Sequence, residues 1–378
     1  MSFQLRNYTA LAALGALLAA CGGQSSDRPA VAGVDTDEER VLNVWNWSDY
    51  IEESLLEQFE SETGIQVNYE VGDSNEMLET KLLAGRTGYD VVVPSASFLA
   101  RQIQAGIFQK LDKSKIPNLQ YVWPEVAERL QVFDPGNEHA VNYMWGTTGI
   151  GINVDKVKER LGDIPLNTWD IVLKPELSAK LKDCGIHMLD APEDIMPGVL
   201  SYLGLNPDSK DAKDFQKAAD LLVKVRGNIQ KFHSSEYINA LANGDICVAV
   251  GYSGDILQAK ARAEEAKNNV NVAYIIPKEG ALMWFDSMAI PADAPHPDEA
   301  HAFINFMMKP EVAAANSNFV AYANGNIASK EHLDEEIRND PGIYPDDETM
   351  KRLFTNTAYD ERAQRTLTRL WTRVKTGR

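Results

Sequence analysis

The amino-acid sequence predicts an α/β fold arranged as two lobes. Its 378 residues are too many for one ordinary core and fit two lobes of roughly 150 residues each. Hydrophobic residues make up 44% of the chain and charged residues 24%, which is the balance of an ordinary globular protein. From residue 41 onward, strand-like and helix-like segments alternate, and this alternation is typical of parallel sheets with helical crossovers.

Three strands are predicted in the first part of the chain. Residues 41–46 read as a strand, and IQVNYEV (65–71) alternates side chains like a half-buried strand. The continuous apolar run YDVVVP (89–94) suits a central strand covered on both faces. We expect these strands to be parallel, with right-handed crossovers. Ligands bind beyond the carboxyl ends of such strands, which is where WSDY (47–50) and PSAS (94–97) fall.

Two helices are predicted between these strands. Asp49 and Glu52 form a D-x-x-E capping box and precede apolar residues at helical spacing. The first helix is therefore expected to begin at this box and to stop at Gly64. NEMLETKLLAG (75–85) is expected to be a short second helix that ends at its final glycine.

A second α/β unit is predicted to begin near YMWGTTGIGINV (143–154). NFVAYANGN (318–326) is expected to be extended or a loop, and the residues after it to be mostly helical. The other predicted strands are 245–252, 271–277 and 282–291, and the other predicted helices are 195–204, 211–226, 255–267, 298–308 and 310–317.

The N-terminus is predicted to be a targeting segment. Arg6 precedes an apolar stretch at 10–20 that is too short to span a bilayer as a helix. The stretch ends in LAAC, which resembles a bacterial lipobox and implies cleavage before Cys21 and lipidation of its thiol. An ordinary secretory signal with a chance cysteine is the alternative. We assign 1–21 to the leader and 22–40 to a flexible tether.

Two cysteines remain, Cys184 and Cys247. In an exported, oxidising compartment an even pair favours a disulfide, although two separate buried thiols are also compatible with the sequence. Two cysteines without partnering histidines make a poor zinc site. The six histidines show no H-x-x-x-H or similar metal spacing, so we expect no metal site. We also expect no cofactor.

The chain is acidic, with 55 acidic against 37 basic residues and a net charge of −18. The negative electrostatic potential of such a chain repels nucleic acid and anionic lipid and attracts small cations. Acidity can also serve only to keep a protein in solution. No basic tract or nucleic-acid motif argues the other way.

Enzymatic motifs are incomplete. GYSGD (251–255) is one residue short of a nucleophile elbow. GIG (149–151) lacks the third glycine of a dinucleotide loop, and no Walker lysine motif occurs. We therefore do not expect an enzyme.

The recurring local pattern is an aromatic residue beside a carboxylate. An aromatic face attracts a cation, worth roughly 0.5–2 kcal/mol per contact, and a buried carboxylate adds a charge-assisted hydrogen bond to an ammonium group. Each pair alone is more often structural, but recurrence at predicted strand ends favours a ligand with several ammonium groups joined by methylenes. The residues are Trp47, Ser48, Asp49, Tyr50, Tyr252, Asp255, Trp284, Asp286 and Tyr322.

Long segments of the chain resemble the polyamine-binding proteins of bacterial ABC transporters, the periplasmic putrescine- and spermidine-binding proteins. The resemblance runs from about residue 41 to the C-terminus. It is carried by WNWSDYI (45–51), VVVPSASFLARQ (91–102), YMWGTTGIGINVDKV (143–157), HSSEYINALANGDICVAVGYSGD (233–255) and RLWTRVKTG (369–377).

This resemblance implies a type II periplasmic-binding-protein fold, in which two α/β lobes are joined by a hinge and close on ligand in the cleft between them. On this basis we expect 41–145 plus about 283–318 to form one lobe. We expect 146–282 plus about 319–378 to form the other.

The resemblance also assigns roles to residues of the first strand ends. Trp47 and Tyr50 would lie on the aliphatic part of the polyamine. Ser48 and Ser95 would offer polar contacts, and Asp49 would lie near an amine.

Further roles follow for residues of the second half. Asp255 and Asp286 would each hold an ammonium group, and Tyr322 would close the aromatic box. Cys184 and Cys247 match positions that pair in related proteins, which implies a disulfide.

Three positions depart from the putrescine-type pattern. Asp194 stands where a glutamate would bind an amine, and its shorter reach could let neighbouring Glu193 substitute. Tyr252 replaces a tryptophan, and Trp284 replaces a phenylalanine. In the family a tryptophan at the last position accompanies spermidine preference, so we expect spermidine to be preferred over putrescine.

The leading hypothesis is a monomeric, periplasmic, lipid-anchored protein that delivers a polyamine to the permease subunits of an ABC transporter. A polyamine sensor that regulates a membrane signalling protein would use the same pocket. Agmatine or a basic amino acid would be alternative ligands, but an amino acid requires an arginine near its carboxylate, and none adjoins these clusters in the sequence.

Overall fold

One mixed sheet of eleven strands runs through residues 40–377, the part of the chain that the computed structural model describes. The predicted leader with Cys21, and all of the tether except its last residue, lie outside these residues. The strand order is β2-β1-β3-β9-β4-β7-β5-β6, while β8 and β10 also pair with β4, and β11 pairs with β9. The strands are β1 (Val41–Trp47), β2 (Gln66–Gly72), β3 (Val91–Val92), β4 (Ala140–Asn153), β5 (Ile186–Met188), β6 (Lys231–Phe232), β7 (Val248–Tyr252), β8 (Val272–Ile275), β9 (Ala281–Ala289), β10 (Ala323–Asn324) and β11 (Leu353–Phe354).

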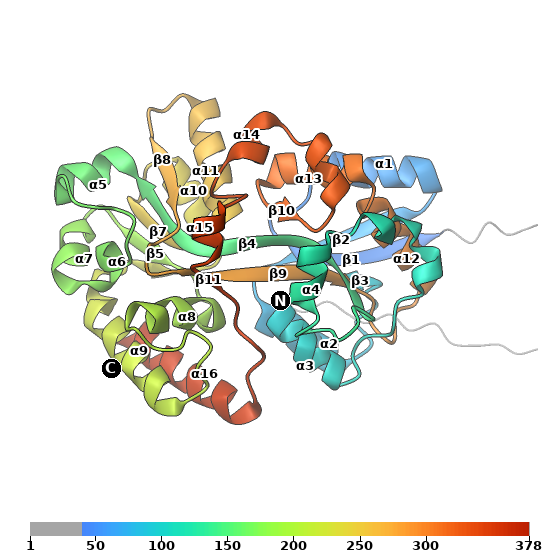
Figure 1. Cartoon of the computed structure of the whole chain (residues 1–378), viewed down its shortest axis with the longest axis horizontal. Helices are drawn as coiled ribbons and strands as arrows, with labels where there is room; N and C mark the ends of the chain where they lie inside the picture. Colours follow the sequence, from blue (N-terminus) through green and yellow to red (C-terminus); the bar gives the residue numbers. More distant parts are fainter. Residues whose placement is uncertain (1–39, 378) are drawn as a thin grey trace, which may run out of the picture. The chain divides into compact units, whose positions relative to one another are not determined.

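Helices surround this sheet on both sides (Figure 1). The α-helices are α1 (Ser54–Thr63), α2 (Asn75–Ala84), α3 (Ala96–Gln104), α4 (Pro124–Leu130), α5 (Val154–Leu161), α6 (Asp170–Leu173), α7 (Pro175–Leu181), α8 (Pro192–Tyr202), α9 (Ala212–Val225), α10 (Tyr237–Ala242), α11 (Ser253–Ala266), α12 (Pro297–Met307), α13 (Pro310–Val320), α14 (Glu335–Asn339), α15 (Asp347–Met350) and α16 (Glu361–Thr376). Short 3-10 helices occur at η1 (Lys113–Lys115), η2 (Pro117–Tyr121), η3 (Arg226–Asn228) and η4 (Ile327–Glu331).

The first three strands have the predicted parallel arrangement. β1 pairs with β2 along its whole length and with β3 on its other side, and both pairings are parallel. β3 contains only two residues, Val91 and Val92, and both are buried between β1 and β9. Their burial on both faces explains the continuous apolar run in the sequence.

Two long antiparallel strands, β4 and β9, connect the two ends of the described structure (Figure 1). Every residue of both strands is buried. Their register places Met144 opposite Asp286 and Gly146 opposite Trp284, so the middle of the pair carries two of the predicted site residues. Because successive side chains of a strand point to opposite faces, Trp284 and Asp286 share one face.

Two large hydrophobic cores include residues from opposite ends of β4, Ile150 and Ile152 in one and Val141, Tyr143 and Met144 in the other. One core gathers residues from 150 to 275 together with 359 to 374, and the other gathers residues from 42 to 144 together with 282 to 322. The exact division of the chain into lobes at the boundaries given above stays a prediction.

The predicted capping box at Asp49 and Glu52 is wrong. α1 begins at Ser54, and its N-cap is Glu53, which makes no side-chain capping bond. Asp49 has a φ of 54°, in the left-handed region. This tight turn redirects the chain and brings Tyr50 into the interior, where it is 4% exposed, so helical conformation cannot begin at Asp49.

Other element boundaries differ from the prediction by a few residues. α13 continues to Val320, so the expectation of extended or loop structure fails for the first residues of 318–326. The helix then ends because Ala321 has a φ of 57°. α8 begins at Pro192, earlier than predicted, because proline is favoured in a first helical turn.

Cys184 and Cys247 form a disulfide with their Cα atoms 5.6 Å apart, which confirms the pairing. The bond ties the residue before β7 to the loop that precedes β5, and these two strands are neighbours in the sheet. Within residues 40–377, no helix is both long and apolar enough to cross a membrane.

Candidate functional site

A cleft of ≈ 760 Å³, counting the part open to solvent, lies at the ends of the strands around β4 and β9. None of the described residues that line it is a lysine or arginine, and the seven acidic ones are Asp73, Glu76, Asp190, Glu193, Asp194, Asp255 and Asp286. The aromatic residues of the lining are Trp47, Tyr50, Phe98, Tyr252, Trp284 and Tyr322.

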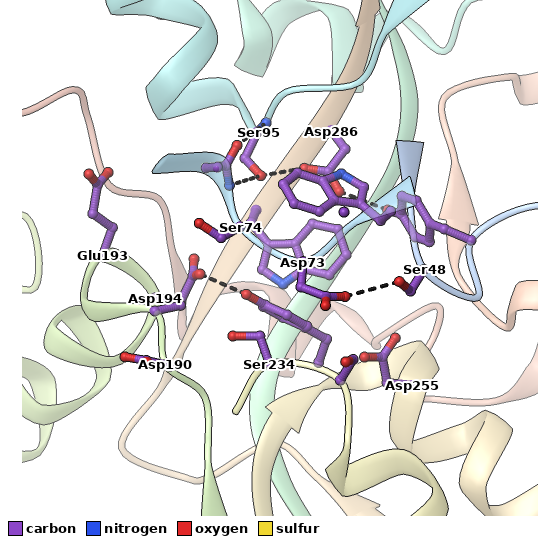
Figure 2. Close-up of a pocket in the computed structure, with 18 of the residues that line it drawn as sticks. Ser48, Asp73, Ser74, Ser95, Asp190, Glu193, Asp194, Ser234, Asp255 and Asp286 are labelled. Atoms are coloured by element: carbon purple, nitrogen blue, oxygen red, sulfur yellow. Dashed lines mark hydrogen bonds between the residues drawn. The ribbon is translucent and has the colours of Figure 1, made fainter. Parts of the chain in front are cut away.

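Asp286 lies in this cleft between two hydroxyl donors (Figure 2). Tyr50 Oη donates to its Oδ2 over 2.9 Å, and Ser95 Oγ donates to its Oδ1 over 2.7 Å. Asn75 Nδ2 in turn donates to Ser95 Oγ, which fixes the serine. Burial raises the pKa of Asp286 to about 7, and the two hydroxyl groups offset part of that effect.

Asp255 has an equivalent pair of donors. Tyr322 Oη and Tyr237 Oη donate to its two carboxylate oxygens, each over 2.6 Å. Asp255 is in the first turn of α11, where the helix dipole favours a negative charge. Burial nevertheless raises its pKa to about 6. A Cβ atom on Gly254 would lie 2.5 Å from the Tyr322 ring, so only glycine allows this close approach.

Asp194 and Glu193 begin α8 and differ in their partners. Tyr252 Oη donates to Asp194 Oδ2 over 2.8 Å. Burial raises the pKa of Asp194 to about 8, and repulsion from Glu193 adds to the effect. Glu193 instead forms an ion pair with Arg101, with 3.1 Å between Nη1 and Oε1. Asp194 therefore has no cationic partner among the described residues, whereas Glu193 has Arg101.

The aromatic side chains contact one another edge to face. Ring centroids are 5.5 Å apart for Tyr252 and Trp284, and 5.2 Å apart for Trp284 and Tyr322. Tyr50 continues the row at 5.2 Å from Tyr322. Trp284 Nε1 is buried and has no hydrogen-bond partner within the described residues. Together these rings form an apolar wall whose faces suit methylene groups and cations.

The structure brings ten of the eleven predicted site residues to this cleft. They are Trp47, Ser48, Tyr50, Ser95, Asp194, Tyr252, Asp255, Trp284, Asp286 and Tyr322. That each of them contacts a ligand stays a prediction.

The predicted placement of Asp49 is wrong. Its carboxylate forms an ion pair with Arg262 of α11 at 2.6 Å, and it does not line the cleft. The left-handed turn at Asp49 directs this side chain away while Tyr50 enters the cleft. The clusters therefore do have arginine neighbours in space, Arg262 at Asp49 and Arg101 at Glu193.

Sequence reasoning missed several residues of the site. Asp73, Ser74 and Glu76 line the cleft after β2, and the strand-end rule applied to that strand would have found them. Asp190 was also missed, and Lys375 compensates its charge at 2.9 Å. No sequence signal points to Tyr237, which supports Asp255 from behind the lining.

Comparison with known proteins is consistent with this geometry. The family model of bacterial extracellular solute-binding proteins matches residues 54–345. The putrescine-binding periplasmic protein SpuD of Pseudomonas aeruginosa is 55% identical over 350 residues, which cover 92% of this chain and 95% of the relative. The putrescine-binding periplasmic protein PotF of Escherichia coli is 53% identical over 343 residues, with coverages of 90% and 93%.

A solved structure extends the comparison to the fold. The spermidine/putrescine ABC transporter substrate-binding protein PotD from Streptococcus pneumoniae superimposes with a TM-score of 0.72 at 35% identity. The match covers 89% of this chain and 99% of that chain. The chain thus shares both its length and its architecture with periplasmic-binding-protein-like substrate-binding proteins.

Proposed function

We propose that this chain, which belongs to the bacterial extracellular solute-binding proteins, binds a linear polyamine in the cleft described above. The observation that carries the proposal is the environment of the Asp255 and Asp286 carboxylates. Both carboxylates are buried and hydrogen-bonded by hydroxyl groups, and no lysine or arginine of the described residues lines the space before them. Buried charges require a partner, and ammonium groups of a ligand would supply it.

The shape of the site supports a ligand with separated charges. Asp286 and Asp255 would each hold an ammonium group by a charge-assisted hydrogen bond. Trp284 and Tyr322 lie beside these carboxylates and would cover the methylene groups between the charges. Asp194, which has no cationic partner among the described residues, would hold a further ammonium group.

The chemistry of the lining argues against an amino acid as ligand. An α-carboxylate would need a cationic or amide-rich subsite, and the cleft offers acidic side chains instead. A polyamine carries only positive charges, so it fits a cleft lined by carboxylates and aromatic rings. The two relatives compared above are themselves named as putrescine-binding proteins.

Spermidine preference over putrescine is the finer part of the proposal. Trp284 presents a wider face than a phenylalanine would, and Asp194 offers a place for a third ammonium group. The names of SpuD and PotF favour putrescine, so the two ligands must be compared directly. Unchanged selectivity in a Trp284→Phe variant would show that this residue does not decide between them.

Transport supplies the cellular role in this proposal. The protein would capture the polyamine in the periplasm as a monomer, anchored to a membrane through lipidated Cys21, and would deliver it to the permease subunits of an ABC transporter. No bond is made or broken in this function, and the cleft requires no cofactor.

Isothermal titration calorimetry tests the proposal. The chain from residue 22 onward, which contains every described element, is refolded to remove carried-over ligand and titrated with spermidine, putrescine, spermine and arginine. We expect polyamine affinities between micromolar and nanomolar, about −8 to −12 kcal/mol, and no binding of arginine. The absence of heat with every polyamine would overturn the proposal.

A further inference from the structure

A cation that belongs to the chain itself lies beside one end of the cleft, against two residues that line it. Phe98 and Glu193 line the cleft, and the guanidinium group of Arg101 contacts both of them. Its carbon atom lies 3.6 Å from the centroid of the Phe98 ring, and its Nη1 lies 3.1 Å from Glu193 Oε1. Two further hydrogen bonds, of 2.6 and 3.1 Å, join Arg101 to Glu79.

These contacts repeat the chemistry of the ligand site. Around Arg101, a cation lies between an aromatic face and carboxylate oxygens. The ligand site offers the same two kinds of group to an ammonium group. At Asp255 and Asp286 the chain supplies no cation, whereas at Glu193 it supplies Arg101. Glu193 is 3% exposed, so its charge depends on this partner.

We propose that Arg101 occupies a cation subsite at this end of the cleft and thereby limits the length of the polyamine that binds. The inference depends on the proposed polyamine-binding function and adds a specificity-determining residue to it. With the guanidinium group in place, an additional ammonium group cannot reach Glu193. Without it, the Phe98 face and the Glu193 carboxylate would be available to the far end of a longer ligand.

The alternative is a purely structural role, because Arg101 also ties α3 to α8. Loss of this connection between α3 and α8 would weaken the binding of every polyamine by a similar factor, because every ligand would bind to the same destabilised cleft. Loss of a length limit would instead change the ratio between long and short ligands. The ratio of spermine affinity to putrescine affinity therefore distinguishes the two roles.

The test compares spermine with putrescine by calorimetry in three proteins: wild type, Arg101→Ala and Arg101→Lys. In Arg101→Ala we expect the ratio of spermine to putrescine affinity to rise by about tenfold, the scale of one charge-assisted contact. Arg101→Lys keeps a cation beside Glu193 and should retain the wild-type ratio. Guanidinium chloride at low millimolar concentration should restore the wild-type ratio to Arg101→Ala by filling the vacated subsite.

Two further variants test the role of the Glu193 carboxylate and the effect of the lost charge in a more conservative substitution. Adding Glu193→Gln to Arg101→Ala should abolish the gain, because the carboxylate is gone. If Arg101→Ala does not fold, Arg101→Gln removes the charge while keeping much of the side chain, and its ratio should shift in the same direction. An unchanged ratio in a folded variant would overturn the length limit. A wild-type protein that binds no polyamine would instead overturn the proposed function itself.

Discussion

Tyr252 donates a hydrogen bond from its hydroxyl group to the carboxylate of Asp194 over 2.8 Å. These are two of the positions at which the sequence departs from the putrescine-type pattern, with tyrosine in place of tryptophan and aspartate in place of glutamate. The tyrosine hydroxyl group provides a donor that tryptophan would not place there, and it holds the shorter carboxylate. The two departures therefore act together rather than eroding the site independently.

Tyr252→Phe tests this relationship. Removing the hydroxyl group leaves Asp194 without its donor, so its pKa should rise further and it should hold an ammonium group less well. We expect spermidine affinity at pH 7 to fall by roughly tenfold, because hydrogen bonds to charged groups are worth about 1.5–3 kcal/mol. Tyr202→Phe is the matched control, because Tyr202 donates to Asp170 over the same 2.8 Å outside the cleft. Equal losses of spermidine affinity in both variants would show that the hydrogen bond from Tyr252 to Asp194 has no specific role in ligand binding.

The elevated pKa values of the cleft predict proton release on binding. Burial raises the pKa of Asp255 to about 6, of Asp286 to about 7 and of Asp194 to about 8. A bound ammonium group favours the ionised carboxylate and lowers these values. Affinity should therefore fall as the pH decreases from 8 to 6, and binding at pH 7 should release protons. Calorimetry in buffers of different ionisation enthalpy measures this release, and a binding enthalpy independent of the buffer would contradict it.

The same shifts predict how the stability of the ligand-free protein depends on pH. A carboxyl group whose pKa is raised on folding binds more protons in the native state, so its contribution to stability is lost as the pH rises through the folded value. For Asp286 this loss should accumulate as the pH rises from the ordinary carboxyl value of 3.8 and should be complete above about 7. Asp286→Asn cannot ionise, so its stability relative to wild type should increase between pH 5 and pH 8. Thermal unfolding at the two pH values measures the difference in stability between the variant and wild type. If that difference is the same at both pH values, the raised pKa of Asp286 is contradicted.

Asp286→Ala removes one of the two proposed anchors. A bound ammonium group would then be buried without its counter-charge, which costs about 3–5 kcal/mol when other buried pairs are broken. We expect the polyamine affinity to fall by more than about a hundredfold. Asp49→Ala is the control, because Asp49 pairs with Arg262 outside the lining and should leave affinity nearly unchanged. A loss of less than tenfold for Asp286→Ala would mean that this residue is not a principal anchor.

The disulfide should stabilise the fold without affecting the ligand. Cys184 and Cys247 are 63 residues apart in the sequence, and closing a loop of that length is worth roughly 4 kcal/mol in the chain-entropy model. Replacing both cysteines with serine should lower the free energy of unfolding by about this amount and leave polyamine affinity intact. Peptide mass mapping without reduction checks the bond itself, and free, alkylatable thiols at both positions would refute it.

Much of this architecture could be predicted because its signals are local. The hydrophobic patterns of residues 41–94 predicted the parallel strands β1, β2 and β3, and the strand-end rule placed Trp47 and Ser95 at the cleft. Alternation along β9 predicted that Trp284 and Asp286 share a face, and both line the cleft.

The errors and omissions concern contacts between distant parts of the chain. Asp49 and Arg262 are 213 residues apart, and no local pattern distinguishes an ion-pair partner from a ligand contact. The same holds for Arg101 and Glu193, which are 92 residues apart. The capping box failed because tertiary packing of Tyr50 requires a left-handed turn that overrides the local helix signal.

The central claim is that Asp255 and Asp286 each receive an ammonium group of a polyamine. X-ray diffraction from crystals of residues 22–378 grown with spermidine tests it most directly. The account predicts one ligand nitrogen within about 3 Å of each carboxylate, with methylene groups against the rings of Trp284 and Tyr322. A ligand whose nitrogens avoid both carboxylates, or one that binds outside this cleft, would contradict it.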